Sequence, residues 1–498
     1  MNYGEELCKK LSEINMRIMN GEGEESILSE KACLEQKLNT LNVNKRNTMN
    51  VKEFAKKVVV KEHDKKKCYE EFMLSSSINC LLHAPTQVGK TDATKDFIEV
   101  CLNANVPVIV SCDNKTDQLT QFYNRISNDF DSYNVTFVKA SDTKFNKIVD
   151  DCFKNNKKIV IFCLDNVSQI TRVKREIVNI VSGDNIKIKK IALIHDEADV
   201  ISKDSNVDEI EEEQSESHKE WLKLCKYFNK ENIDLKRVFV TATPENVVYK
   251  YSVEYIIQLS VPNNYIGYDK IEYKVMESPN EIKDILIKEQ NRRILDNENG
   301  VILYCVDKKI SEGQDPTFVS VCSYLKKCIV SSYNGNGITA RVLNNSKFEA
   351  RLVKFAKLNN KVKGCKKITY EDQSTNETKN VWNIKGMAIK DFYQICKDVN
   401  SGIIVTIGMD LIARGISFVS SEKVADAIAA TTMIYKPGAT LHNVALAQAI
   451  GRITGTARPD LVRRLYASQD IIDNYIAFNK NQKQYLKEIT KTEGKTLN

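Results

Sequence analysis

Short, unbroken runs of apolar residues alternate with helical stretches between about residues 75 and 260. Each run is rich in Val, Ile and Leu and lacks polar alternation, which is typical of strands in a parallel sheet covered on both faces. The runs are INCLLHA, VPVIVSC, KKIVIFCL, KIALIHDEA and KRVFVTAT. The pattern predicts an α/β domain over residues 46–262.

A second series of apolar runs follows the turn-rich segment VPNNYIGYDK, which begins at Val261. It comprises GVILYCV, KCIVSSY, SGIIVTIG and ATTMIY. This series predicts a second α/β domain over residues 263–470, with a basic insertion at about 335–395 and a basic tail at 471–498. The chain has 498 residues, which is long enough for two such domains.

Apolar residues also recur at helical spacing in two series before the first domain. They are Leu7, Leu11, Ile14 and Ile18, then Ile27, Leu34, Leu38 and Leu41, with glycines at 21 and 23 between the series. The pattern predicts a helical hairpin over residues 1–45. Such a hairpin either caps the domain that follows or docks a protein partner.

Composition and charge narrow the class of protein. With 42% hydrophobic and 28% charged residues, the chain has the composition of a globular protein. Its net charge of +7 permits a polyanionic partner without requiring one. The 14 cysteines include no CxxC pair and no zinc spacing, which predicts free thiols in a reducing compartment. The start resembles no signal peptide and no run reaches about 18 apolar residues, so we expect an intracellular protein without a membrane span.

Two strongly charged segments interrupt the alternating pattern. Residues 208–220, DEIEEEQSESHKE, are expected to form a solvated acidic loop or helix start. Residues 347–367 are strongly basic, and the apolar Phe348, Leu352 and Phe355 follow helical spacing among them, which predicts a basic amphipathic helix. Its basic side chains, Arg351 and Lys354 among them, either follow nucleic-acid phosphates or only solvate one face.

The run INCLLHA leads into a segment typical of a phosphate-binding loop. Its residues are Ala84, Pro85, Thr86, Gln87, Val88, Gly89, Lys90 and Thr91, and helical periodicity follows in TDATKDFIEVCL. Between a strand and a helix, the backbone N–H groups of such a loop favour the β-phosphate of a nucleotide. Lys90 would lie between the β- and γ-phosphates, and the Thr91 hydroxyl would hold Mg²⁺. We therefore expect ATP and Mg²⁺ to bind here.

An acidic motif closes the apolar run IALIH, where Asp196 and Glu197 follow the strand. An acid at the end of a buried strand beside the phosphate loop can hold Mg²⁺, and a neighbouring Glu can orient and deprotonate the attacking water. Together with the phosphate loop, these acids describe nucleotide hydrolysis. His83 and His195 also end strands, and we interpret both as ordinary hydrogen-bonded histidines.

The run KRVFV ends in TATP at residues 241–244, and with it the order of motifs resembles superfamily 2 helicases and translocases across roughly residues 75–470. The resemblance implies two tandem RecA-like P-loop NTPase domains with parallel sheets. It also implies that Thr241 and Thr243 link the ATP site to nucleic acid. Asp199 would then couple the acidic motif to Thr241.

Two motifs in the second domain extend the resemblance. Residues 408–417, GMDLIARGIS, are similar to the family's fifth motif, which implies roles for Asp410 at the nucleotide and for Arg414 in coupling. Residues 448–455, QAIGRITG, resemble the sixth motif, which implies catalytic roles for Gln448 and Arg452. By this resemblance, Arg452 would reach the γ-phosphate as an arginine finger supplied in cis.

The chain departs from the family at two positions. Gly455 stands where a second arginine is expected, and Ser417 stands where an acid often closes the fifth motif. Either Arg458 substitutes for the missing arginine, or charge compensation is weaker and hydrolysis is slower.

Superfamily 2 motors bind the nucleic-acid backbone through loops that follow strands. By position, the candidates in this chain are Ser111, Asn114, Lys115, Asn166, Ser168, Lys308 and Lys309. The RNA-specific branch also has an adenine-reading glutamine upstream of the phosphate loop, and this chain has none between Gln36 and Gln87. The resemblance therefore favours DNA over RNA as the polymer.

Three functions stay open from the sequence. The first is an ATP-driven helicase or translocase. The second is an ATP-dependent switch or scaffold with weak turnover, indicated by the missing arginine at 455. The third is the motor subunit of a restriction-like nuclease, because NNYIGYDK and ARGISF also resemble helicase-like ATPases of restriction and repair systems and of large DNA viruses. Asp269, Glu272 and Lys274 have a spacing compatible with a nuclease or with an exposed strand.

Overall fold

The computed structural model describes most of the chain from residue 59 onward. The described residues are 59–61, 65–114, 116–130, 134–183, 188–198, 216–244, 247–248, 251–306, 310–335, 337–343, 345–358, 362, 364–372, 377–399, 402–408, 412, 418–420, 427–437 and 443–491. The chain divides into two units, one of Met1–Val60 with Lys483–Asn498 and one of Lys61–Gln482. The predicted hairpin over residues 1–45 lies outside the described residues, as does the acidic segment up to residue 215.

The first sheet has the strand order β1-β8-β2-β7-β6-β3-β5-β4 among the described residues. Its strands are β1 Val59–Lys61, β2 Asn79–His83, β3 Val108–Cys112, β4 Val135–Lys139, β5 Lys158–Leu164, β6 Lys190–Asp196, β7 Asp234–Thr241 and β8 Tyr255–Gln258. All pairs from β8 to β4 are parallel. The five predicted runs form β2, β3, β5, β6 and β7, and the structure adds β1, β4 and β8.

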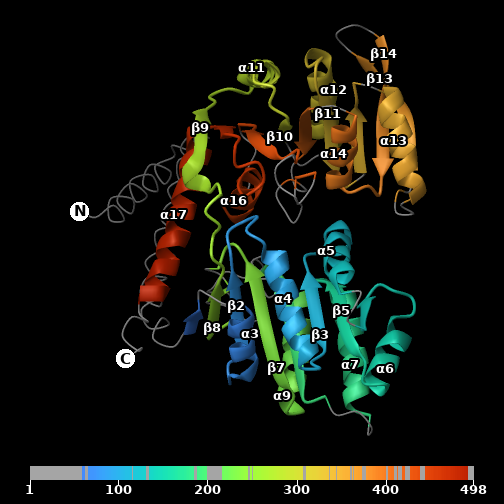
Figure 1. Cartoon of the computed structure of the whole chain (residues 1–498), viewed down its shortest axis with the longest axis vertical. Coiled ribbons are helices and arrows are strands. Elements are labelled where there is room, and N and C mark those ends of the chain that lie inside the picture. The colour runs from blue at the N-terminus through green and yellow to red at the C-terminus, as the bar shows by residue number, and fades with distance from the viewer. Residues whose placement is uncertain are drawn as a thin grey trace, which may run out of the picture. The chain divides into compact units, whose positions relative to one another are not determined.

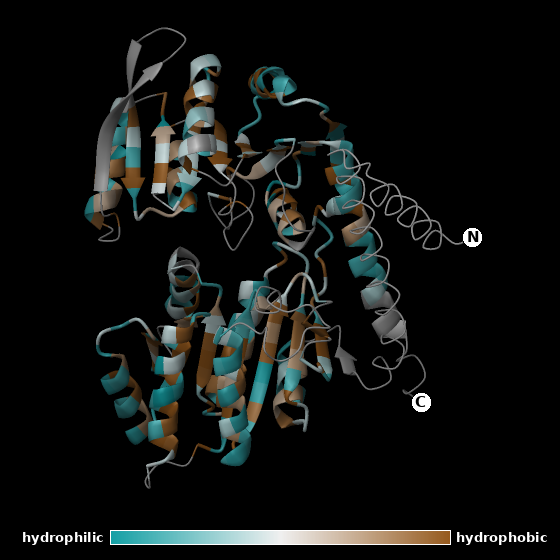
Figure 2. Ribbon diagram, turned by 180° about the vertical axis from the view of Figure 1, so that it is seen from behind, coloured by the Kyte–Doolittle hydropathy of each residue, from teal (hydrophilic) through white to brown (hydrophobic). Residues whose placement is uncertain are grey.

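The first sheet is apolar on both faces, which explains why its strands are unbroken apolar runs. In β5, Val160 and Phe162 belong to one buried cluster, while Ile159 and Ile161 belong to another, because successive side chains point to opposite faces. Figure 2 shows these strands in hydrophobic colours. The first cluster includes residues of α3 (Lys65–Leu74), α4 (Lys90–Asn103) and α5 (Thr116–Asp129), and the second includes residues of α6 (Phe145–Lys154), α7 (Val167–Val181) and α9 (Glu216–Lys230). Helices therefore cover both faces (Figure 1).

The second sheet has the order β13-β14-β12-β11-β15-β10-β16-β17-β9 among the described residues. Its strands are β9 Ile271–Val275, β10 Gly300–Cys305, β11 Ile329–Asn334, β12 Gly337–Arg341, β13 Gly364–Asp372, β14 Glu377–Lys385, β15 Ile403–Gly408, β16 Ala430–Tyr435 and β17 Arg463–Ala467. From β11 to β9 the pairs are parallel, while β12, β14 and β13 pair antiparallel. The predicted fold of two tandem RecA-like α/β domains is confirmed, although the second sheet is mixed and not wholly parallel.

The second sheet is flanked by helical elements, most of which contribute to two further buried clusters. The helical elements are η2 Tyr268–Lys270, η3 Pro279–Glu281, α11 Ile282–Leu295, η4 Ile310–Gln314, α12 Asp315–Tyr324, α13 Asn345–Leu358, α14 Ile389–Asp398, α16 Asn443–Ile450, η6 Gly451–Ile453 and α17 Gln469–Lys491. The last of these includes residues 471–491 of the predicted basic tail, whose residues 492–498 lie outside the described residues. Ile471, Ile472 and Tyr475 of α17 are buried in the core, so this part of the chain is a packed helix.

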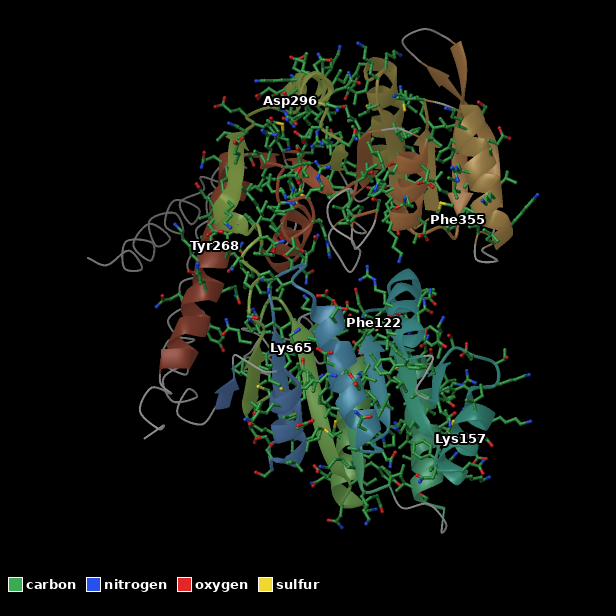
Figure 3. The ribbon with its side chains drawn as sticks, in the orientation of Figure 1. Lys65, Phe122, Lys157, Tyr268, Asp296 and Phe355 are labelled. Atoms are coloured by element: carbon green, nitrogen blue, oxygen red, sulfur yellow. The ribbon has the colours of Figure 1, made fainter. Side chains whose placement is uncertain are left out.

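The basic insertion is a helix followed by a hairpin. Helix α13 buries Phe348 and Leu352 completely and Phe355 partly, as its amphipathic pattern predicts (Figure 3). The predicted helix does not extend to residue 367, because residues 364–367 begin β13, which pairs with β14. Antiparallel strands can be joined by a short connection, so the insertion widens the sheet without a crossover helix.

Two expectations from composition concern membranes and thiols. In the part of the chain that the structure describes, no helix is long and apolar enough to cross a membrane. None of the described cysteines forms a disulfide, and all but Cys225 are buried.

Candidate functional site

The phosphate loop connects β2 to α4, and residues 85–91 are all half-buried. Gly89 lies at the N-cap of α4 with a left-handed φ of 95°. Glycine takes this conformation without strain and carries no side chain to cap the N–H groups of the first helical turn. These N–H groups and the positive end of the helix dipole favour an anion. The loop therefore has the geometry of a phosphate site.

Lys90 and Glu197 face each other beside this loop. Nζ of Lys90 lies 3.8 Å from Oε1 of Glu197, and their side chains are 12% and 14% exposed. Strand β6 ends at Asp196, and Glu197 then adopts a left-handed φ of 52°. Such a conformation costs a non-glycine residue roughly 1 kcal/mol or more and recurs at functional sites. The structure thus places the predicted hydrolytic Glu within reach of the predicted phosphate-binding lysine.

Gln448 and Arg452, which belong to elements that flank the second sheet, also lie near Glu197. Gln448 on α16 donates from Nε2 to Oε2 of Glu197 at 3.4 Å. Arg452 in η6 is buried and donates from Nε to the carbonyl of Ile412 at 3.2 Å. Burial lowers the pKa of Arg452, and the charge of Glu197 opposes that shift. Glu197 therefore interacts with both of the other residues predicted to be catalytic.

Thr91 and Asp196, the predicted Mg²⁺ ligands, are both half-buried at the carboxyl edge of the first sheet. Among the described residues, no group of three His, Cys, Asp or Glu side chains is arranged to hold a metal ion. Mg²⁺ commonly keeps several waters and takes one or two protein oxygens together with phosphate oxygens. One hydroxyl and one carboxylate fit that chemistry.

Thr241, the last residue of β7, and Thr243 are both buried and hydrogen-bonded to each other. The backbone N–H of Thr243 donates to Oγ1 of Thr241 at 3.0 Å, and the two hydroxyl oxygens lie 3.2 Å apart. The N–H of Ala84, the first residue of the phosphate loop, is 3.4 Å from the carbonyl of Thr241. The predicted coupling residues thus contact the phosphate loop through the backbone. Asp199 lies outside the described residues, so its link to Thr241 stays a prediction.

The interpretation of both histidines as hydrogen-bonded is wrong for His195. Within the described structure, neither of its ring nitrogens has a hydrogen-bond partner, although the residue is buried. The ring stacks on Phe239, with centroids 5.2 Å apart, and meets the edge of Trp221 at 5.3 Å. Aromatic packing holds this ring, and burial lowers its pKa so that it stays neutral.

Because His83 is buried, we expect the folded protein to lose stability on acidification. Burial, with Lys90 adding to it, lowers the pKa of His83 from 6.5 to about 4. Between these values the unfolded chain binds a proton that the folded chain does not, so stability falls as the pH falls through 6.5, by up to about 3 kcal/mol. We expect His83→Gln to reduce this fall in urea-denaturation free energies between about pH 7 and pH 4.5. An identical pH dependence in both proteins would contradict the prediction.

Three predicted nucleic-acid contacts form one hydrogen-bonded chain where β3 and β5 end. Nδ2 of Asn166 donates to Oδ1 of Asn114 at 2.9 Å, and Oγ of Ser168 donates to Oδ1 of Asn166 at 3.0 Å. Asn166 also caps α7 by accepting from the N–H of Gln169. The carboxyl ends of parallel strands meet at one edge, so this chain of side chains shares the edge with the phosphate loop.

Ser111 does not join them. It is fully buried in β3, which continues to Cys112 and pairs with β5 and β6 on its two sides. Its hydroxyl is inside the sheet, so the prediction that it contacts a polymer is contradicted. Six other predicted site residues lie outside the described residues: Lys115, Asp199, Lys308, Lys309, Asp410 and Arg414.

The suggested nuclease residues lie near or on the edge strand β9. Asp269 is in η2, just before the strand. Glu272 pairs with Arg464 at 3.2 Å, and Lys274 is exposed. Along this edge, one acid is neutralised by an arginine, as in an ordinary exposed strand.

Sequence reasoning missed two aromatic residues that link parts of the site. Nε1 of Trp221 donates to Oδ1 of Asp165 at 2.8 Å, so α9 connects the loop before Asn166 to the ring of His195. The hydroxyl of Tyr265 donates to the carbonyl of Thr86 at 3.1 Å. Neither belongs to a motif, and their partners are distant in sequence, so no local signal identifies them.

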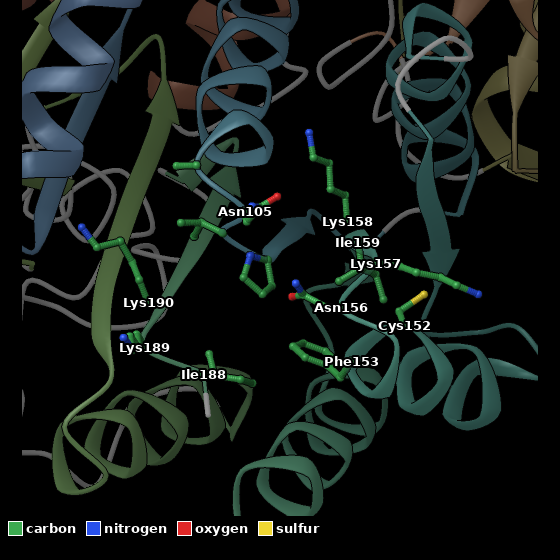
Figure 4. Close-up of a pocket in the computed structure, with 13 residues that line it drawn as sticks. Asn105, Cys152, Phe153, Asn156, Lys157, Lys158, Ile159, Ile188, Lys189 and Lys190 are labelled. Atoms are coloured by element: carbon green, nitrogen blue, oxygen red, sulfur yellow. The ribbon is translucent and has the colours of Figure 1, made fainter. Parts of the chain in front are cut away.

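A pocket of about 280 Å³ lies at the opposite, amino edge of the first sheet (Figure 4). Its walls are the loops that precede β3, β5 and β6, with Asn105, Asn156 and Lys189 among the lining residues. Lys157, another lining residue, pairs with Asp151 at 2.8 Å. No predicted site residue lines this pocket, so it is separate from the site around Glu197.

No protein-family model and no curated protein sequence matches the chain. Among solved structures, the chain is similar to Dbp5 of S. cerevisiae bound to RNA and ADP BeF3, with 14% identity and a TM-score of 0.45 over 86% of this chain and 93% of that one. It is also similar to the DEAD-box helicase Mss116 bound to ssRNA and UDP-BeF, with 15% identity and a TM-score of 0.47 over 86% and 85% of the two chains.

A third similar structure is RecG bound to a three-way DNA junction, with 13% identity and a TM-score of 0.44 over 89% of this chain and 49% of RecG. The fold assignment itself rests on the strand orders and on the phosphate loop. They describe two tandem RecA-like α/β domains, the first of which carries the phosphate loop.

Proposed function

We propose that the chain is an ATP-dependent nucleic-acid helicase or translocase that hydrolyses ATP with Mg²⁺. The observation that carries this proposal is the pair of contacts made by Glu197, one to Lys90 of the phosphate loop and one to Gln448 of α16. These side chains are far apart in the sequence and share one site. Lys90, Glu197 and Gln448 carry functional groups that enzymes use to transfer a phosphoryl group to water.

In this proposal, residues of the first domain bind the phosphates, hold Mg²⁺ and activate the attacking water. The N–H groups at the start of α4 and the ammonium of Lys90 bind the phosphates. Thr91 and Asp196 would hold Mg²⁺, whose charge offsets that of the phosphates. The carboxylate of Glu197 orients the attacking water and accepts its proton while the new P–O bond forms and the bond to the ADP oxygen breaks.

Arg452 and Gln448 supply the part of the site that comes from the second sheet. Arg452 is a buried cation close to Glu197, and a desolvated guanidinium stabilises developing charge on a γ-phosphate far better than an exposed one. The Gln448 amide keeps the carboxylate of Glu197 in place through its hydrogen bond. Loss of the γ-phosphate would remove the ligand shared by both sheets, which is how hydrolysis would drive movement.

The polymer would lie along the carboxyl edge of the first sheet. The chain of Asn114, Asn166 and Ser168 offers amide and hydroxyl donors at a helix N-terminus, which suits phosphate oxygens. Helix α13 presents Arg351 and Lys354 on its exposed side. DNA is favoured over RNA because the adenine-reading glutamine of the RNA-specific branch is missing before the phosphate loop.

An ATPase assay without polymer, and with single-stranded DNA, duplex DNA or single-stranded RNA, tests the proposal. We expect DNA to stimulate hydrolysis and RNA to do so less. A rate unchanged by every polymer would overturn the motor. ATP-dependent polymer binding with almost no turnover would support the switch instead, and metal-dependent cleavage of the DNA would support the motor subunit of a nuclease.

Arg351 and Lys354 give a salt-dependence prediction. Each phosphate contact contributes roughly 0.9 to the slope of log K against log salt for duplex DNA. We expect the double variant Arg351→Ser, Lys354→Ser to reduce that slope by about 2, measured by fluorescence anisotropy across salt concentrations. The matched control is Lys283→Ser, Lys288→Ser on α11, which removes the same charge outside the proposed path. Equal changes of slope in both double variants would show only a net-charge effect.

A further inference from the structure

The phosphate loop contacts the segment around Arg452 directly, through protein atoms alone. Nε2 of Gln87 donates to the carbonyl of Arg452 at 3.0 Å. The hydroxyl oxygens of Thr86 and Thr454 lie 3.1 Å apart. The hydroxyl of Tyr265 reaches the carbonyl of Thr86, so two consecutive residues of the loop are engaged. These contacts join residues more than 175 positions apart along the chain.

Because Gly455 has no side chain, the side chain of Gln87 can pack against its backbone. A Cβ at position 455 would lie 2.9 Å from Oε1 and 3.0 Å from Cβ of Gln87. The backbone at 455 is held in place, because Gly455 and Ile266 exchange both of their backbone hydrogen bonds at 3.0 Å. The backbone also has a φ of 111°, which glycine alone tolerates well. The missing second arginine of the sixth motif therefore has a steric explanation: Gln87 fills its place.

Gln87 itself adopts a strained backbone, with a left-handed φ of 60°. A glycine would take this conformation without cost, whereas glutamine loses roughly 1 kcal/mol or more. An amide side chain at such a position is consistent with a role for the side chain. Within the described residues, the Gln87 side chain hydrogen-bonds to the Arg452 carbonyl.

We propose that Gln87 is a positioning residue for the hydrolysis proposed above, and that Gln87 and Gly455 form a matched pair. The amide of Gln87 holds the Arg452 peptide and thereby fixes the guanidinium beside Glu197. Where the family's second arginine would contribute a charge, this chain has a neutral contact. The proposal rests on the proposed function, because the positioned group acts only if the site hydrolyses ATP.

The first test is the conservative variant Gln87→Asn. Asparagine tolerates the left-handed region but is one methylene shorter and does not reach the Arg452 carbonyl. We expect kcat for polymer-stimulated hydrolysis to fall roughly tenfold, as for loss of one hydrogen bond that positions a reacting group. KM for ATP should change by less than about threefold, because the N–H groups and Lys90 that bind phosphate are untouched. A kcat equal to that of the unmodified chain would overturn the positioning role.

The second test is a double-mutant cycle with Gln87→Gly and Gly455→Ala. The φ strain of alanine at 455 is present in both backgrounds and cancels, so the cycle isolates the contact between the two side chains. We expect Gly455→Ala to lower kcat at least about fivefold more when Gln87 is present than in the Gln87→Gly background. Equal losses in both backgrounds would overturn the matched pair.

The same cycle measured on urea-unfolding free energies separates this inference from the proposed function. If the unmodified chain hydrolyses no ATP with any polymer, the proposed function and the positioning role both fail. Coupling in the unfolding cycle would then still support the matched pair. If the unmodified chain is active but Gln87→Asn matches it in kcat, only the positioning role fails.

Discussion

Glu197→Gln is expected to lower polymer-stimulated ATP hydrolysis by about a thousandfold, because the amide cannot accept the proton of the attacking water. Binding of ATP should persist, since in the proposed site Lys90 and the N–H groups of α4 would still hold the phosphates. The variant should keep its fold, because glutamine has the same shape as glutamate and keeps an oxygen that can accept the hydrogen bond from Gln448. A quenched-flow measurement of one turnover, with fluorescent-ADP affinity beside it, gives both quantities.

Two comparisons make that result specific. Lys90→Ala should lose nucleotide affinity as well as turnover, because it removes a full charge from the phosphate site. Glu216→Gln on α9 is the matched control, since its side chain is 69% exposed and pairs with Lys219 on the same helix turn. Glu197→Gln with a rate within tenfold of the unmodified chain would contradict its assignment as the base.

The strands that the sequence predicts are those whose two faces are both buried. Strand β5 has every residue after Lys158 buried, so its apolar run is unbroken and easy to recognise. Strand β4 at the sheet edge is only partly buried, and β8 has four residues, so neither produces a comparable run. Tertiary position, which an isolated segment does not contain, decides which short apolar segments become strands.

The basic insertion shows the limit of periodicity as a signal. Apolar residues at helical spacing identify α13, because Phe348 and Leu352 must point to one side of a helix to be buried. The basic residues continue past the helix into β13, so charge alone suggests a longer helix than exists. Charge is tolerated equally on an exposed helix face and on an exposed hairpin, and therefore does not discriminate between them.

The part of the candidate site that lies at the carboxyl ends of parallel strands could be predicted from the sequence, because these strand ends meet at one edge of the sheet. Lys90, Asp196 and Thr241 all follow or end parallel strands of one sheet, so their shared edge follows from the pattern. Ser111 fails because β3 continues past it to Cys112, so its side chain lies inside the sheet and not at its edge. The contact of Gln87 with Arg452 joins residues 365 positions apart, and no local pattern contains it.

Arg452→Ala is expected to lower kcat by about a hundredfold with little change in nucleotide affinity, because in the proposed mechanism its charge would stabilise the γ-phosphate mainly in the transition state. Arg452→Lys should recover only part of this. The guanidinium donates from Nε to the Ile412 carbonyl while its charge lies near Glu197, and a single ammonium group cannot do both. Single-turnover rates at saturating ATP measure the effect.

The variant Arg458→Ala tests whether Arg458 takes the role of the second arginine of the sixth motif, which is missing at position 455. Arg458 donates from Nε and Nη2 to Asp460, with the shortest contact at 2.7 Å, so its charge is already compensated. We expect its removal to change kcat by less than about twofold, since an exposed or locally paired charge contributes little to a distant transition state. If Arg458→Ala were as damaging as Arg452→Ala, a second arginine would act at the γ-phosphate after all, and Gln87 would have a different role from the one inferred here.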